Sequence, residues 1–61
     1  MCLSTAYETS ETGAVLAENV SYVTLEDGVI TMTDIMGATT KIKGALRSTD
    51  LTRGVIIILP E

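Results

Sequence analysis

The chain has 61 residues, with four basic and eight acidic side chains and a net charge of −4. This acidic balance disfavours binding to phosphate backbones, which depends on clustered Lys and Arg, so we expect no nucleic acid partner. No apolar run approaches the ~20 residues of a membrane span, and the first residues lack the charged and apolar regions of a signal peptide. We therefore expect a cytoplasmic protein with no membrane partner.

The small size of the chain predicts that it associates with a partner. A domain of this length buries only about 60% of its unfolded surface and is marginally stable alone. The single cysteine excludes an intramolecular disulfide, and the chain has no histidine to complete a structural zinc site. Association into an oligomer is therefore the expected source of the missing stability. With two Tyr, no Phe and no Trp, the core must be aliphatic.

The first half of the chain reads as short strands separated by turns. Residues 3–7 alternate in pattern as a strand does, and residues 8–13 form a polar turn. A short apolar segment follows at 14–17. The polar pair at 18–19 interrupts it, and residues 20–25 then form the next strand.

A hairpin is the clearest local prediction. Asp27-Gly28 lies between two β-rich segments, and this dipeptide is the strongest short-range signal for a hairpin turn. Residues 29–33 supply the returning strand. Another turn is expected at 34–37, although it is unusually apolar, and a Thr-rich strand at 38–42 that ends at Lys43-Gly44.

The last third contains the most hydrophobic segment. Residues 45–50 fit either a helical turn or a short strand, and Asp50 is suited to cap the turn that follows. Residues 55–59 are five consecutive aliphatics, which indicates a strand buried on both faces. One face would cover the core, and we expect the other to contact a second subunit.

Together these segments predict an all-β fold. Six to seven short antiparallel strands, with turns every 8 to 12 residues, are typical of a small single-domain SH3-like barrel or sandwich. No stretch has helical periodicity over three turns.

Enzymatic chemistry is poorly supported. Without histidine, neither a Ser–His nor a Cys–His nucleophile pair can form within the chain. The carboxylates are scattered through predicted turns, and the five glycines are isolated turn residues rather than a phosphate-binding loop. We therefore expect a protein that is not an enzyme.

Cys2 is the candidate metal ligand. It is the only cysteine and follows Met1 directly, and it is small enough for an aminopeptidase to remove Met1. The thiolate and α-amine of Cys2 would then close a five-membered chelate ring around a divalent metal. One cysteine cannot fill a coordination sphere, so a second chain would have to contribute. The alternative is that Cys2 is a small buried hydrophobe in the first strand.

Several short motifs occur in a distinctive order. They are Met1-Cys2-Leu3, Glu18-Asn19-Val20, Asp27-Gly28-Val29, Gly44, Asp50-Leu51-Thr52-Arg53-Gly54-Val55-Ile56 and Leu59. Over nearly its whole length the sequence resembles the CooT family, small accessory proteins of nickel-dependent carbon monoxide dehydrogenase maturation. We therefore treat residues 1–61 as a single CooT-like domain.

The resemblance implies a compact β-barrel-like homodimer that binds one Ni(II) ion between its subunits, with Cys2 of each subunit as the key ligand. It implies a nickel-binding accessory protein that serves a nickel enzyme such as carbon monoxide dehydrogenase, so an apo nickel enzyme is a further expected partner. The chemistry is consistent, because square-planar coordination by sulfur and nitrogen suits Ni(II). A two-fold axis near the chain starts would explain how one cysteine per chain suffices.

Two alternatives remain. The opening is also similar to that of the HypC family of hydrogenase chaperones, in which a residue matching Cys2 is functional. Those chains continue with Ile-Pro-Gly, whereas this one reads Leu3-Ser4-Thr5. Under that alternative Cys2 contacts the metal centre of a partner protein. The other is a small RNA-binding β-barrel, which the acidic charge disfavours.

Overall fold

The computed structural model describes residues 3–61, and these form five strands and no helix. The all-β prediction is confirmed. No helix in this part of the chain could span a membrane. The strands are β1 (Ser4–Glu8), β2 (Val15–Glu26), β3 (Val29–Asp34), β4 (Thr39–Asp50) and β5 (Val55–Pro60).

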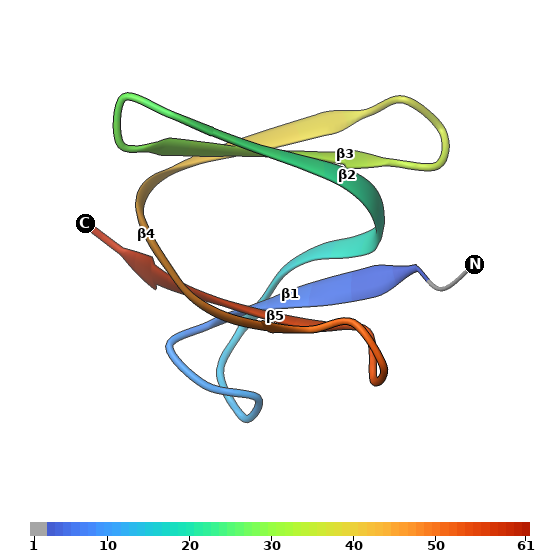
Figure 1. Cartoon of the computed structure of the whole chain (residues 1–61), viewed down its shortest axis with the longest axis horizontal. Coiled ribbons are helices and arrows are strands. Elements are labelled where there is room, and N and C mark those ends of the chain that lie inside the picture. Colours follow the sequence, from blue (N-terminus) through green and yellow to red (C-terminus); the bar gives the residue numbers. More distant parts are fainter. Residues whose placement is uncertain (1–2) are drawn as a thin grey trace.

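The strands close into a barrel in the order β1-β2-β3-β4-β5. In Figure 1, β1 and β5 lie side by side below the β2–β3 hairpin, and the long strands β2 and β4 curve between these two layers. All sequential neighbours pair antiparallel, but β1 and β5 pair parallel, from Thr5 with Val55 to Glu8 with Ile58. This closing pair joins two strands that are far apart in sequence, so no tight hairpin requires them to be antiparallel.

The prediction of six to seven strands is wrong in number because two predicted breaks are bends within longer strands. The polar pair at 18–19 does not end β2. Between the pairs Ser4–Val20 and Ala6–Ala17 the register shifts by one residue, as in a β-bulge. Asn19 adopts a positive φ of 56° there, and its carbonyl accepts a hydrogen bond from the Ile35 amide at 3.2 Å. A bulge bends a strand and increases its twist without ending its pairing.

The second predicted break, at Lys43-Gly44, is also wrong. β4 continues through Gly44, which has a φ of 155°, and then pairs with β5 as far as Asp50 opposite Val55. Residues 45–50 are therefore strand, not a helical turn. Glycine inside a strand permits a sharp bend at the corner of a barrel, and this sequence uses it in that way.

The core is aliphatic, as expected. Its buried side chains are Ala6, Val20, Ile30, Met32, Ile56 and Ile58. Met32 is 1% exposed and fills space within this cluster.

The prediction that β5 is buried on both faces is confirmed at its centre. Ile56 and Ile58 belong to the core, and Ile57, which points the opposite way, is only 6% exposed. In the sheet Ile57 lies between Tyr7 of β1 and Ser48 of β4. The chain thus covers most of this outer position itself.

Candidate functional site at the start of β1

The candidate ligand Cys2 lies outside the described residues, and the description begins with Leu3. Leu3 is 38% exposed, and Ser4 begins β1. The Thr5 amide donates a hydrogen bond to the Gly54 carbonyl at 2.8 Å. A side chain at position 54 would come within 2.8 Å of the Leu3 carbonyl oxygen. Leu3 therefore lies directly beside the turn that joins β4 and β5.

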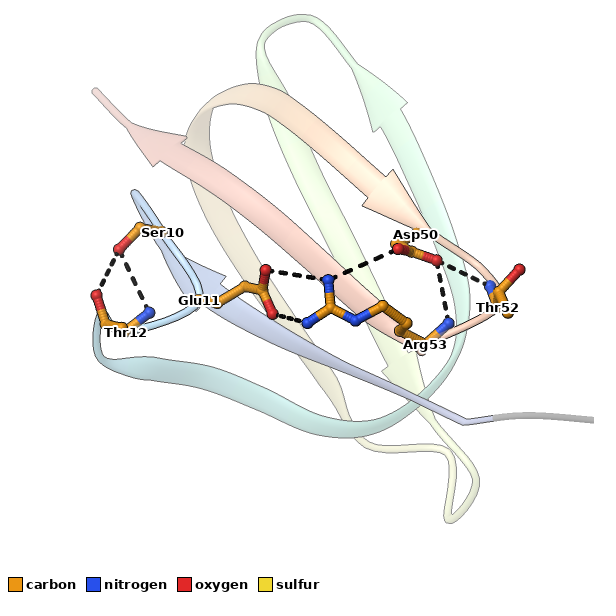
Figure 2. Close-up of polar contacts among 6 residues, drawn as sticks. All are labelled: Ser10, Glu11, Thr12, Asp50, Thr52 and Arg53. Carbon is orange, nitrogen blue, oxygen red and sulfur yellow. Dashed lines mark hydrogen bonds and ion pairs between the residues drawn. The ribbon is translucent and has the colours of Figure 1, made fainter.

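Asp50 orders this turn, as the sequence predicted. Its Oδ1 accepts hydrogen bonds from the backbone amides of Thr52, at 3.1 Å, and Arg53, at 3.0 Å (Figure 2). A carboxylate that satisfies two turn amides replaces the solvent contacts that those amides would otherwise need. The backbone of Leu51 lies between Asp50 and the two amides that Asp50 binds, and its side chain is 76% exposed.

An ion pair joins the β4–β5 turn to the turn between β1 and β2. Arg53 donates to Glu11 through both terminal guanidinium nitrogens, with the Nη1–Oε2 distance at 3.1 Å (Figure 2). Asp50 Oδ2 lies 3.8 Å from the same guanidinium. The hydrogen bond and charge of Glu11 raise the pKa of Arg53 above its usual value, so it stays protonated. Because the pair is exposed to solvent, it orients the two turns more than it stabilises the fold.

An uncharged groove of about 310 Å³ runs from Ser4 across the open side of the barrel. Its floor is formed by core side chains and its rim by exposed apolar ones. We name it the β2–β4 groove; its floor contains Val20, Leu46 and Ile56, and its rim contains Tyr22, Leu25 and Leu51. None of its ten lining residues carries a charge. The groove therefore begins two residues after Cys2.

The remaining metal-binding side chains do not gather elsewhere in the part of the chain that the structure describes. Residues 3–61 contain no group of three or more Cys, His, Asp or Glu positioned to hold a metal ion. Asp34 and Asp50 accept hydrogen bonds from their own turns. Among the described methionines, Met32 is buried in the core and Met36 is 87% exposed in the β3–β4 turn.

Comparison with known proteins identifies the family. The family model described as "CO dehydrogenase accessory protein CooT" matches residues 1–59. The chain belongs to the CooT family. The match includes Cys2 and every strand except the last residue of β5. CooT proteins are accessory proteins of carbon monoxide dehydrogenase, which agrees with the resemblance seen in the sequence motifs.

A solved structure gives the same fold. The crystal structure of a candidate CooT protein from Carboxydothermus hydrogenoformans superposes with a TM-score of 0.86, covering 98% of each chain at 18% sequence identity. At this identity the likeness establishes the CooT-type barrel and nothing about individual residues. No curated protein matches the chain.

Sequence reasoning found Cys2 but missed the β2–β4 groove. The rim residues Tyr22 and Leu25 lie on a predicted strand, where an apolar side chain is ordinarily assigned to the core. Leu51 gave the only signal, because a large aliphatic residue is unusual in a turn between Asp50 and Thr52.

Proposed function

We propose that this CooT protein is a nickel-binding accessory protein. Cys2 of each of two subunits captures a shared Ni(II) ion, one per homodimer, for the maturation of a nickel enzyme such as carbon monoxide dehydrogenase. The observation that carries the proposal is the family match over residues 1–59, which includes the only cysteine of the chain. Nickel is the cargo of this protein, and its partner after capture is an apo nickel enzyme.

The chemistry of Cys2 supports the choice of metal. Thiolate sulfur and amine or amide nitrogen are donors that Ni(II) accepts in square-planar geometry. Two chains related by a two-fold axis supply two sulfurs from one cysteine each. Capture and release make and break only metal–ligand bonds, so the protein needs no catalytic residues. We assign it to the cytoplasm, where a free thiol stays reduced.

The charge of the molecule supports cation capture rather than RNA binding. The net charge of −4 favours the encounter with a dication. Of the four basic side chains, Arg53 is neutralised by Glu11. We therefore propose neither nucleic acid nor membrane as a partner.

The test is a nickel titration of the wild-type protein and of Cys2→Ser. Loss of an outer-shell partner already costs about 10- to 100-fold in metal affinity, so loss of the ligand itself should weaken binding by more than about 100-fold. Met36→Ser is the matched control, because it removes an exposed sulfur from a turn and should leave the affinity unchanged.

Native mass spectrometry of the same samples reports Met1 removal, oligomeric state and metal stoichiometry together. One nickel per two chains is expected for the wild type and none for Cys2→Ser. Equal nickel affinity in the wild type and in Cys2→Ser would show that Cys2 is not a nickel ligand. A partner protein that is retained through Cys2 after chelation of all metal would favour the HypC-like alternative instead.

A further inference from the structure

Leu25 lies on the core-facing side of β2, yet it is exposed. It pairs with Ile30, which is 1% exposed, and follows Val23, which packs against the core in the same orientation. Neighbours in register point to the same face of a sheet. Leu25 is nevertheless 57% exposed. An inward-facing aliphatic side chain with this exposure indicates a core that the single chain leaves open.

The pairing register explains the opening. Among the described residues, β1 pairs with β2 only as far as Val20, so the rest of β2 is hydrogen-bonded to β3 alone. In the same way β4 leaves β3 at Lys43 and continues beside β5. The β2–β4 groove lies between these two unpaired strand edges. Core side chains form its floor because no strand covers them there.

The part of the rim that Leu51 forms has an ordered backbone. Leu51 is 76% exposed and Tyr22 63% exposed. The turn that carries Leu51 is capped by Asp50 and held through Arg53 to Glu11. A turn whose backbone is already held in place loses little backbone entropy when it is covered, which favours its use as a contact surface.

The distribution of charge favours a second copy of this chain as the partner that binds in the groove. The chain carries 12 ionisable side chains of Asp, Glu, Lys and Arg among 61 residues, eight acidic and four basic, but none lines the groove. Two copies of a protein with a net charge of −4 repel one another, and they can approach closely only through a surface without like charges. An isologous contact requires such a self-complementary patch, because each residue meets the same surface on its partner.

We propose that the β2–β4 groove is the surface through which two copies of this chain associate, with Leu51 and Leu25 of each copy packed against the groove of the other. This inference depends on the proposed function in one respect only, namely that a second copy of the chain is present. Ser4 lies at one end of the groove, so the contact includes the start of β1 of each copy. The outer face of β5 is a weaker candidate than the sequence indicated, because Ile57 is already covered within one chain.

The experiment introduces one charge into the contact. Leu51→Glu and Leu25→Glu each place a carboxylate on an exposed rim position, and Met36→Glu adds the same charge at an exposed position in the β3–β4 turn. Sedimentation equilibrium over a range of concentrations should show a dimer dissociation constant raised at least about 30-fold for the two rim variants, as for a contact hot spot. Met36→Glu should dissociate like the wild type. Circular dichroism checks that each variant is folded.

Hydrogen exchange of the wild type gives an answer that needs no variant. The amides of residues 21–25 and 51–52 should exchange more slowly at concentrations above the dimer dissociation constant than below it. Exchange that does not change with concentration, or rim variants that dimerise like Met36→Glu, would overturn the groove as the dimer surface.

The outcomes separate this inference from the nickel site. Cys2→Ser should remain dimeric, because the contact does not need the metal. If the rim variants dimerise normally while Cys2→Ser loses nickel, the surface is wrong and the metal site stands. If the rim variants are monomeric while Cys2→Ser binds nickel normally, the surface stands and the metal site is wrong. A wild type that is monomeric at all concentrations overturns the surface and the shared site together.

Discussion

Gly44 lies where β4 stops pairing with β3, at Lys43, and begins to pair with β5. Its amide donates a hydrogen bond to the Gly28 carbonyl at 2.9 Å. A Cβ at this position would overlap the Leu59 carbonyl oxygen and lie 2.9 Å from the Pro60 Cα. Both neighbours are backbone atoms of β5, which cannot move without breaking the β4–β5 pairing. Glycine is therefore required here both by conformation and by space.

Gly44→Ala should destabilise the fold by at least about 2 kcal/mol, since backbone strain and overpacking each cost about 1–3 kcal/mol. Gly37→Ala is the matched control. Gly37 has a φ of 90° and no atom within 4 Å of the added Cβ, so it should cost about 1 kcal/mol from conformation alone. Urea denaturation at one fixed chain concentration measures both. Equal losses would show that the close approach of β5 does not matter.

At the scale of elements, two aspartates hold the turns that present exposed apolar side chains. Asp34 Oδ1 accepts hydrogen bonds from the amides of Met36, at 2.8 Å, and Ala38, at 3.0 Å. Asp50 does the same for the β4–β5 turn. These caps explain why the apolar turn predicted at 34–37 forms, because the carboxylate satisfies the amides whatever the side chains around it are.

Asp34→Ala should destabilise the protein by about 1 kcal/mol, the usual cost of losing a side-chain cap. Asp34→Asn keeps the accepting oxygen and should lose less than half of that. The midpoint of thermal unfolding, compared at equal concentration, measures the difference. If Asn proves as costly as Ala, the charge of Asp34 matters and the cap geometry does not.

At the scale of the whole molecule, stability depends on a few buried aliphatic side chains. At about 0.05–0.15 kcal/mol per residue, a chain of 61 residues is stabilised by about 3–9 kcal/mol. Ile58 is fully buried and belongs to the strand that closes the barrel against both β1 and β4. A cavity at Ile58 would therefore weaken the pairing of β5 with β1 and with β4.

Ile58→Ala should cost about 2–5 kcal/mol, a large part of that stability, whereas Ile58→Val should cost only about 0.5–1.5 kcal/mol. Circular dichroism with urea titration separates the two. The dimer proposed above would stabilise the folded state by mass action, so the loss should then appear smaller at high chain concentration. A loss for Ile58→Ala no larger than the loss for Ile58→Val would mean that packing at this position does not limit stability.

The sequence by itself determined the all-β class, the Asp27-Gly28 hairpin, the burial of the centre of β5 at residues 56–58 and the family. These features depend on local chemistry: alternation, turn residues and short motifs are readable without a partner strand. Cys2 was also named from sequence, because its position and its being the only cysteine need no coordinates.

Only the tertiary structure decided that the chain bends at 18–19 and at Gly44 instead of stopping there, because a polar pair or a glycine marks a bend and an end alike. Only the pairing with neighbouring strands shows whether such a position is a bend within a strand or the end of one. The tertiary structure likewise decided which apolar residues are covered: Ile57 is buried by its own chain, whereas Leu25 and Leu51 are left exposed at the β2–β4 groove. Burial is a property of the closed barrel and its openings, and these depend on contacts between residues far apart in sequence.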